Sequence, residues 1–321
     1  MPSPSVETAS CVAAADIGGT NLRLAIARRC ETGVPRMIAS SSTTIAGTTD
    51  PNAVVDLISG GVDRLMAENS IPRKALAALA AGAPGITNVD AGIVIVTSYL
   101  LGWRDVPLRA MIEKSLGVPA SVDNDVNLAA LGEACAGAGR GQSDFVFIAI
   151  GTGVGAGIVL DGRLFRGSAW TAGEVGYMLL PGLDSDPSAR GKPGGLEMSI
   201  GGDGIRSQWQ SRSPSEGATP RRDLQATEIL DLAGRGEPLA KSLLDQTGRL
   251  LASAIYNISL VLNCPLFVLG GGVGVHPALR HAADARLRAW GTRVEPRIVP
   301  SELGADAQLF GAIRLALDLT K

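Results

Sequence analysis

The chain has 321 residues, of which 45% are apolar, and this is enough to bury a large core and to form two domains. With 29 basic and 31 acidic residues its formal net charge is −2, so no overall field attracts DNA, RNA or an anionic membrane. No run of about eighteen apolar residues predicts a transmembrane helix, and the first ten residues lack the basic and apolar parts of a secretory signal. We therefore expect a soluble, cytoplasmic protein whose partner is a small neutral or anionic ligand, with no nucleic acid and no membrane involved.

The histidines and cysteines restrict the chemistry further. Only His276 and His281 are present, so a mechanism that needs a histidine base or several imidazole ligands is disfavoured, and we expect both on the surface of a helical stretch. The cysteines are far apart in the sequence and form no C-x-x-C pair, which disfavours a metal knuckle or a redox dithiol and favours reduced, buried thiols. They are Cys11, Cys30, Cys135 and Cys264.

The first segment with chemical content is CVAAADIGGTNLRLAIARR, residues 11–29. Two apolar runs flank a glycine-rich turn, which predicts a β-hairpin whose backbone N–H groups a phosphate can approach. Around the turn the segment combines flexible backbone with an acid, a hydroxyl, an amide and a cation: Asp16, Gly18, Gly19, Thr20, Asn21 and Arg23. We expect Asp16 to hold Mg²⁺ through its water shell and the other residues to face phosphate oxygens. The alternative is a tight β-turn whose polar groups satisfy one another.

Capping residues and apolar stripes predict two long helices. Asp50 and Pro51 begin the first, and Pro238 begins the second. Apolar residues recur at helical spacing and predict faces packed on the core: Val54, Leu57, Ile58, Val62 and Leu65 in the first helix, and Leu243, Leu244, Leu250, Leu251, Ile255 and Ile258 in the second.

Three polar residues crowd together in SVDNDVNLAALGE, residues 121–133, where an apolar strand passes into a helix. Taken alone, Asp123, Asn124 and Asp125 predict helix capping, because Asp and Asn side chains accept bonds from free N–H groups and suit the positive end of the helix dipole. Whether they also carry chemistry depends on the rest of the chain.

A second hairpin is predicted over DFVFIAIGTGVGAGIVLDGRLF, residues 144–165, with Gly151, Thr152, Gly153 and Gly155 in and beside its turn. The segment also fits the G-x-G-x-x-A pattern of dinucleotide-binding folds, but that pattern needs a helix directly after the turn, and here a strand follows. A third glycine turn leads into a helical pattern and contains Gly270, Gly271 and Gly272.

The plan of apolar run and glycine turn thus occurs early in the chain and again near its middle, with helices between. This predicts two α/β domains of similar plan that face one another across a cleft. Residues 184–195 and 211–223 are polar stretches with proline and glycine, and we expect both to be loops.

Over nearly the whole chain, and in the same order, these motifs resemble the ROK family of sugar kinases and repressors. DIGGTNLR is similar to the family's first phosphate motif, IGTGVGAGIV to its second, and FVLGGGV to its adenosine motif. Further matches are GAPG (82–85), LLGWRDVPL (100–108), DNDVNLAALGE (123–133), GEVG (173–176) and SELGADAQLFGAIRLAL (301–317). The resemblance implies two ribonuclease-H-like domains of the actin/hexokinase type around a central cleft. The N-terminal domain would hold residues 1–119 and 303–321, and the C-terminal domain residues 120–302.

The resemblance also implies roles for the polar residues. Asp125 would be the base that takes a proton from the acceptor hydroxyl of the sugar, and Asn124 would bind the sugar. A carboxylate suffices because orienting the hydroxyl matters more than full deprotonation in a loose phosphoryl-transfer transition state. Glu174 and Glu197 match sugar-binding glutamates, and Asp123 lies where its charge could raise the proton affinity of Asp125.

The chain departs from the family pattern at the zinc site. Many relatives bind zinc through one histidine and three cysteines, and the corresponding positions here are Tyr177, Ser188, Arg190 and Gly195. We expect no zinc, because none of these side chains is a good zinc ligand. Tyr177 is expected to offer its hydroxyl to the sugar or to fill space with its ring. Tyr99 likewise stands where many family kinases have asparagine.

The expected function is ATP-dependent phosphorylation of a hexose with Mg²⁺, and glucose is the first acceptor to consider. Mannose, an N-acetylhexosamine or a cyclitol as acceptor, and polyphosphate as donor, stay open, and a homodimer is implied by the resemblance alone. One rival is a sugar-responsive transcription regulator, but only about fifteen residues precede Asp16, fewer than a DNA-binding domain needs. The other rival is a sugar-binding protein without catalysis.

Overall fold

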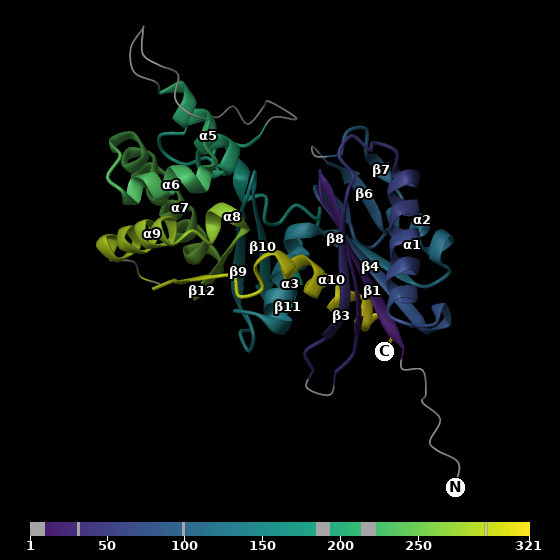
Figure 1. The fold of residues 1–321 in the computed structure, drawn as a ribbon. Coiled ribbons are helices and arrows are strands. Elements are labelled where there is room, and N and C mark those ends of the chain that lie inside the picture. Colours follow the sequence, from purple (N-terminus) through teal and green to yellow (C-terminus); the bar gives the residue numbers. More distant parts are fainter. Residues whose placement is uncertain are drawn as a thin grey trace. The chain divides into compact units, whose positions relative to one another are not determined.

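The computed structural model of the chain describes residues 10–30, 33–97, 100–183, 193–212, 223–291, 293 and 295–321 (Figure 1). Contacts within the chain divide it into two compact units. The first comprises Met1–Arg140, Arg166–Thr171 and Asp306–Lys321, and the second comprises Gly141–Phe165 and Ala172–Ala305.

The first unit is built on a five-stranded sheet in the order β3-β2-β1-β4-β8. Strands β1, β2 and β3 pair in antiparallel fashion, as the predicted hairpin requires, whereas β4 and β8 continue the sheet parallel to β1. The strands are β1 (Cys11–Ile17), β2 (Asn21–Arg28), β3 (Arg36–Thr44), β4 (Leu76–Ala83) and β8 (Ala120–Asn124). A small antiparallel sheet in the same unit contains β5 (Ile86–Asn88), β6 (Ile93–Val96) and β7 (Arg104–Val106).

Both faces of the large sheet are covered by helices, and the alternation of side chains along β1 shows why. Cys11, Ala13 and Ala15 belong to the core under α1 and α2, while Val12 and Ala14 belong to a second core under α3 and α10. The α3/α10 face of the sheet is rich in alanine, which leaves room for α10 to lie close to the strands (Figure 1). These helices are α1 (Pro51–Glu68), α2 (Leu108–Leu116), α3 (Asp125–Ala136) and α10 (Ala307–Asp318), with the short turns η1 (Arg73–Ala75) and η3 (Gly304–Asp306).

Helices α3 and α10 cross at a point where both lack side chains. A methyl group on Gly132 would collide with the carbonyl oxygen of Ala307, and one on Gly311 would collide with that of Leu128. Each glycine therefore lies against the backbone of the other helix, which lets α3 and α10 pack closely. Helix α10 thereby supports α3, which begins at Asp125.

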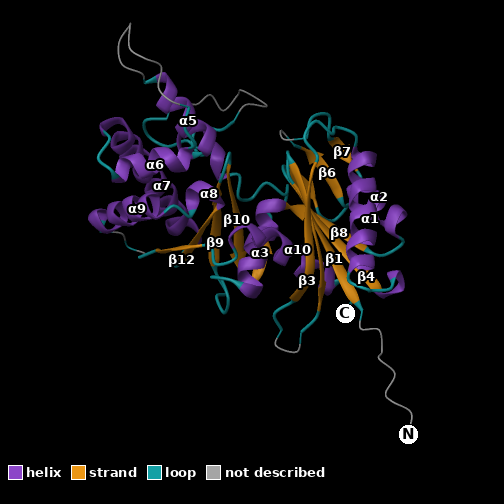
Figure 2. Cartoon of the chain, in the orientation of Figure 1, coloured by secondary structure: helices purple, strands orange, loops and turns teal. Residues whose placement is uncertain are grey.

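The second unit repeats the plan of the first. Its five-stranded sheet has the order β11-β10-β9-β12-β13, with an antiparallel hairpin followed by two strands parallel to β9. Figure 2 shows three of these strands, β10, β9 and β12, beside the helices of the unit. The strands are β9 (Phe145–Ile150), β10 (Val154–Leu160), β11 (Arg163–Phe165), β12 (Leu266–Gly270) and β13 (Arg297–Pro300). The prediction of a second hairpin is confirmed, and a strand rather than a helix follows the turn at Gly151.

Helices of the second unit share one hydrophobic core with this sheet. They are α4 (Glu197–Ile200), α5 (Gly202–Ser211), α6 (Ala226–Gly234), α7 (Pro238–Leu262), α8 (Gly271–Gly274) and α9 (Pro277–Trp290), with the short turn η2 (Val175–Tyr177). Of these, α4, α5 and α6 pack mainly against other helices of the layer. Both predicted long helices are confirmed as α1 and α7, including the cap at Asp50, whose side chain accepts a bond from Asn52 N at 2.9 Å. In the predicted stripes Leu57 is the exception, because it is 38% exposed.

The division into units differs from the predicted domains at residues 120–140, 166–171 and 303–305. The sequence predicts residues 120–140 in the C-terminal domain, whereas contacts place them in the first unit. The reason is that β8 pairs with β4 and extends the first sheet, and α3 packs against α10. The segment 166–171 joins the first unit as well, between two stretches of the second.

Other predictions concern the histidines, cysteines and loops. His276 caps α9 and is partly buried beside Asp231, whereas His281 is exposed on that helix. The four cysteines are free thiols, of which Cys11 and Cys264 are buried. Most of the two predicted loops, 184–195 and 211–223, lies outside the described residues. Among the helices that the structure describes, none has the length and apolar character that a bilayer crossing requires.

Candidate active site

The carboxyl ends of three neighbouring strands bring the acidic residues of the first unit together. Asp16 on β1 is opposite Gly82 on β4, and Gly82 is in turn opposite Asp123 on β8. Adjacent strands are ~4.8 Å apart, so Asp16 and Asp123 are about 10 Å apart across the sheet. Open α/β sheets bind ligands at this edge. We call Asp16, Asp123, Asn124 and Asp125 the base cluster.

Asp16 is held in place by an arginine from the neighbouring strand. Arg23 is directly opposite Asp16 on β2, and its Nε and Nη2 atoms donate to Asp16 Oδ2 at 2.9 Å and 2.5 Å. The Arg23 Nη2 atom also donates to Oε1 of Gln308 on α10 at 3.2 Å. Burial raises the pKa of Asp16, and the charge and hydrogen bonds of Arg23 oppose that rise. Arg23, expected to face phosphate oxygens, thus serves here as the ionic partner of Asp16.

The first glycine turn follows Asp16 and is open to solvent. Gly18 N donates to Asn21 O at 2.8 Å, which closes the turn, and the carbonyl of Thr20 accepts from Ile45 N at 2.7 Å. Gly19, Thr20 and Asn21 are exposed. The turn therefore presents backbone and small polar groups that an anionic ligand could reach.

The donor set around Asp16 fits a magnesium ion that is held through its waters better than a metal ion that is enclosed by protein side chains alone. Among the described residues, no three His, Cys, Asp or Glu side chains converge as a metal site requires. Magnesium commonly keeps several waters and binds one or two carboxylates together with substrate phosphates. A single buried carboxylate already tied to Arg23 fits that mode, with the ion held through its waters.

Asn124 is the N-cap of α3, so the simple capping interpretation of the sequence is correct for this residue. Its Oδ1 atom accepts from Val126 N at 2.9 Å and from Asn127 N at 3.1 Å. Its Nδ2 atom donates to the carbonyl oxygen of Gly85 at 2.9 Å. An asparagine amide has two N–H bonds, so one donor is left for a ligand.

Asp125 is the first residue of α3, where the positive end of the helix dipole stabilises its charged form. Its Oδ1 atom accepts from Val126 N at 2.9 Å. Gly82 on β4 packs against the beginning of α3, because a methyl group at Gly82 would lie 2.9 Å from the Cδ1 atom of Leu128 and in ordinary contact with Asp125. Gly85 has φ of 93°, which favours glycine, and its carbonyl holds Asn124. The GAPG segment therefore supports the beginning of α3, where Asn124 and Asp125 lie.

Asp123 is fully buried, with a side chain only 1% exposed, and it is paired with an arginine that the sequence did not indicate. The Nε and Nη2 atoms of Arg166 donate to Asp123 Oδ2 at 2.9 Å and 2.6 Å. This positive charge offsets the charge by which Asp123 was expected to raise the proton affinity of Asp125. Arg166 is 43 positions away in the chain, so no local pattern could have identified it.

In the second unit, the other two glycine turns lie side by side. The turn between β9 and β10 is closed by a hydrogen bond from Gly151 N to Gly153 O at 3.0 Å. At the N-terminus of α5, Gly202 N donates to the carbonyl oxygen of Gly151 at 2.7 Å. A methyl group on Gly271 would collide with the carbonyl oxygen of Ile150. Thr152 is exposed in the turn between β9 and β10. This adjacency supports one ligand site that both turns share, although they are about 120 residues apart.

Three further predicted residues gather in the second unit, and we call Glu174, Tyr177 and Glu197 the glutamate cluster. Glu197 Oε2 accepts from Val154 N at 2.8 Å, just after the glycine turn. Burial raises the pKa of Glu197, and burial with the nearby charge of Glu197 raises the pKa of Glu174, although Glu174 is an exposed residue. The pKa of Tyr177 is raised by desolvation and by both glutamates, and the residue is 52% exposed. No salt bridge joins either glutamate to a cation in the part of the chain that the structure describes.

The positions of the family's zinc ligands are only partly described. Gly194 packs against the backbone of Gly176 and Tyr177, which brings Gly195 close to Tyr177. Neither Tyr177 nor Gly195 offers a good zinc ligand. Ser188 and Arg190 lie outside the described residues, as does Tyr99.

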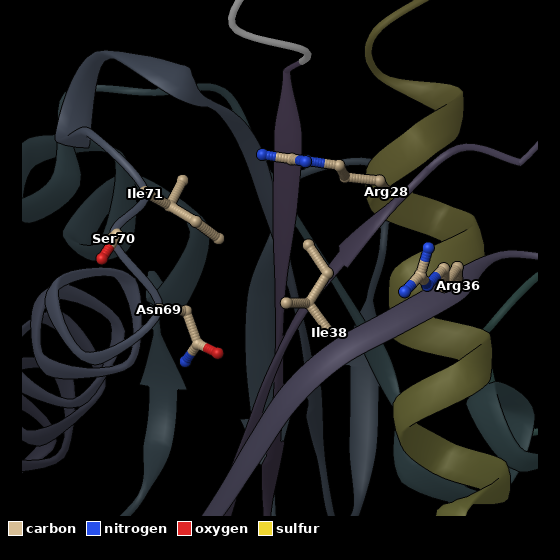
Figure 3. A pocket seen from close by; sticks show the side chains of 6 residues that line it. All are labelled: Arg28, Arg36, Ile38, Asn69, Ser70 and Ile71. Atoms are coloured by element: carbon tan, nitrogen blue, oxygen red, sulfur yellow. The ribbon is translucent and has the colours of Figure 1, made fainter.

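One cavity of about 200 Å³ lies away from the predicted site residues (Figure 3). It is at the far end of the β2–β3 hairpin from the first glycine turn, because β2 begins at Asn21 and ends at Arg28. Figure 3 shows the side chains that line it, which are Arg28, Arg36, Ile38, Asn69, Ser70 and Ile71. None of these residues belongs to the base cluster, so this cavity is separate from the candidate site.

Comparison with known proteins adds to this geometry. Residues 12–319 match the ROK family. A glucokinase of Halalkalibacterium halodurans is 30% identical over 314 residues, which cover 92% of each chain.

Two solved structures have the same fold across the chain. The ROK family glucokinase from Streptomyces griseus in complex with glucose and AMPPNP gives a TM-score of 0.75 at 25% identity, covering 96% of this chain and 100% of that chain. A ROK family transcriptional regulator, a homolog of the E. coli MLC protein, gives a TM-score of 0.80 at 25% identity, covering 97% of this chain and 78% of that one. The fold alone therefore does not separate a kinase from a regulator.

Proposed function

This chain belongs to the ROK family and is a sugar kinase, and we propose that it transfers the terminal phosphoryl group of ATP to a hydroxyl of a hexose. Glucose, which would give glucose 6-phosphate, is the acceptor to test first. Support for glucose comes from the glucokinase of H. halodurans, with which this chain shares 30% identity, and from the glucose bound in the S. griseus structure.

The observation that carries the proposal is the position of Asp125. Asp125 is the first residue of α3 and follows the carboxyl end of β8. Its carboxylate therefore lies on the same edge of the sheet as the first glycine turn. A hydroxyl that approaches this edge meets a charged carboxylate close to groups suited to phosphate. Asn124 already caps the helix, so capping alone does not explain why the carboxylate of Asp125 lies on the same edge as the glycine turn.

In the reaction, Asp125 would orient the acceptor hydroxyl and take its proton while the sugar oxygen bonds to the γ-phosphorus and the bond from phosphorus to ADP breaks. Asn124 would donate its remaining N–H to the sugar. The two glutamates of the second unit would accept bonds from sugar hydroxyls, and charge-assisted bonds of that kind select the positions of the hydroxyls.

The nucleotide would be bound by backbone groups of the glycine turns. We assign its phosphates to residues 18–21 and 151–155 and its nucleoside to residues 270–272. Asp16 would hold a hydrated Mg²⁺, which when bound neutralises charge on the phosphates. Arg23 would keep the Asp16 carboxylate charged and fixed in direction.

The test is ADP release from MgATP by the purified protein with a panel of acceptors. The panel contains glucose, mannose, N-acetylglucosamine, N-acetylmannosamine, allose and a cyclitol, and polyphosphate replaces ATP in a parallel series. Turnover with one hexose supports the proposal and identifies the acceptor.

The panel can also contradict the proposal. If no acceptor gives turnover while calorimetry still detects binding of glucose, the chain binds sugar without phosphorylating it. A non-catalytic or regulatory role would then replace the kinase assignment.

A further inference from the structure

Arg166 occupies an unusual place in the chain. It directly follows β11 of the second unit, yet the segment 166–171 belongs to the first unit, and the chain then returns to the second at Ala172. The segment is anchored in the first unit by Arg166, whose Nε and Nη2 atoms both donate to Oδ2 of Asp123. The Arg166 side chain is 25% exposed and that of Asp123 is 1% exposed, so the ion pair is largely out of water.

The other carboxylate oxygen of Asp123 is bonded to the start of α3. Asp123 Oδ1 accepts from Asn124 N at 2.8 Å and from Asn127 Nδ2 at 3.2 Å. Asn127 is in the first turn of the helix and is buried. One carboxylate thus connects Arg166, the backbone of the N-cap residue and the first turn of α3, and Asp125 lies between these two attachment points.

We propose that Arg166 is a positioning residue for Asp125, acting through Asp123. The pair would fix the backbone at Asn124 and the first turn of α3, and so the direction of the Asp125 carboxylate. This inference rests on the proposed function, in which Asp125 is the base.

The charge of Arg166 matters as well as its hydrogen bonds. A buried carboxylate without a cation partner is strongly unfavourable, and here it would stand two residues from a second carboxylate that must be charged in order to act. Without Arg166, Asp123 would have to take up a proton, move, or repel Asp125. Each of these outcomes disturbs the first turn of α3.

Four variants test the proposal: Arg166→Gln, Arg166→Lys, Asp123→Asn and the double variant Asp123→Asn/Arg166→Gln. Arg163→Gln is the matched control, because Arg163 is an exposed arginine three positions earlier on β11. The measurements are kcat, the KM values for sugar and MgATP, and the melting temperature of every variant.

If Arg166 acts through Asp123, Arg166→Gln lowers kcat about a hundredfold, the size expected for a misplaced catalytic group, while the KM for MgATP changes less than about twofold. Arg166→Lys restores part of kcat, since lysine keeps the charge but not the two-pronged contact. The double variant is no slower than either single variant, because residues that act as one unit are not additive. The double variant also lacks the unpaired buried charge, so it reports on catalysis even if Arg166→Gln fails to fold.

Several results would overturn the assignment. A rise in the KM for MgATP at unchanged kcat would mean that Arg166 binds the nucleotide directly. Losses in kcat that add up in the double variant would mean that the two residues act independently. Normal kinetics with a lowered melting temperature would mean that the pair only stabilises the fold. If the wild-type protein and Arg163→Gln show no turnover with any acceptor, the proposed function itself fails, and this assignment falls with it.

Discussion

The base cluster and the glutamate cluster differ in whether their carboxylates have cation partners. Asp16 and Asp123 in the first unit are each paired with an arginine that donates two hydrogen bonds. Glu174 and Glu197 in the second unit have no cation partner among the described residues, and their pKa values are raised by burial. The protein therefore balances the charges of Asp16 and Asp123 with its own arginines, whereas no cation among the described residues balances those of Glu174 and Glu197.

The difference matches the ligands that we assign to the two clusters. Groups that face a metal ion, phosphates and a proton transfer need fixed positions before the substrate arrives, and buried ion pairs give that rigidity. Groups that recognise a neutral sugar need free acceptor capacity, since sugar hydroxyls supply the donors. An arginine on either glutamate would compete with those hydroxyls.

The largest effect is expected in the base cluster, from Asp125→Asn. This variant keeps the size of the side chain and its position at the start of the helix but removes the base. We expect kcat to fall by about 10²–10⁴-fold, with the KM for sugar little changed. Steady-state ADP release measures this, and Asp56→Asn on the exposed side of α1 is the control. Full activity of Asp125→Asn would reduce Asp125 to a structural role.

In the glutamate cluster we expect a loss of binding rather than of rate. Glu197→Gln and Glu174→Gln each remove one charged acceptor, and hydrogen bonds to charged groups contribute about 1.5–3 kcal/mol. The KM for sugar should therefore rise about 10–100-fold, while the KM for MgATP stays near that of the wild type. The exposed Asp245→Asn serves as the control. An unchanged sugar KM in both variants would remove these residues from the sugar site.

The framework beneath the base cluster can be tested by stability. Gly311→Ala would place a methyl group against the carbonyl oxygen of Leu128, so we expect the free energy of unfolding to fall by about 1–3 kcal/mol. Gly60→Ala is the matched control, because Gly60 is exposed in the middle of α1 with no atom near its added methyl group. There we expect a gain of about 0.5–1 kcal/mol. Urea unfolding of both variants gives the comparison, and equal effects would contradict the close crossing of α3 and α10.

The smallest effect concerns pH. Since the pKa of Glu174 is raised, its carboxylate takes up a proton at a higher pH than an ordinary glutamate, and sugar binding weakens as the pH falls through that raised value. Replacing Glu197 by glutamine removes a charge that contributes to the rise, so the pH at which the sugar KM increases should move downward. The sugar KM measured against pH in the wild type and in Glu197→Gln checks this. A shift upward would have the wrong sign for the coupling that we describe.

Much of the architecture could be predicted from local patterns. The glycine turns between apolar runs indicate both hairpins, and Asp50 with Pro51 indicates the start of α1. These features are local, because a turn or a cap is decided by residues a few positions apart. The D-N-D segment also stands out in the sequence as a site of interest, and its asparagine does cap α3.

Strand order and buried ion pairs were decided by the tertiary structure. The sequence predicts residues 120–140 in the second domain, whereas the structure places them in the first unit. No local pattern in β8 indicates that this strand pairs with β4. The partner of Asp123 is an arginine 43 positions away, brought there by a segment that leaves the second unit for six residues, Arg166–Thr171. Arg23 is expected from the sequence to face phosphate, although its place opposite Asp16 across the hairpin makes it a partner of that acid. Residue type and spacing thus determined which chemical groups the protein carries, whereas only the packing of distant strands decided which charges are balanced, because burial and proximity depend on the whole fold.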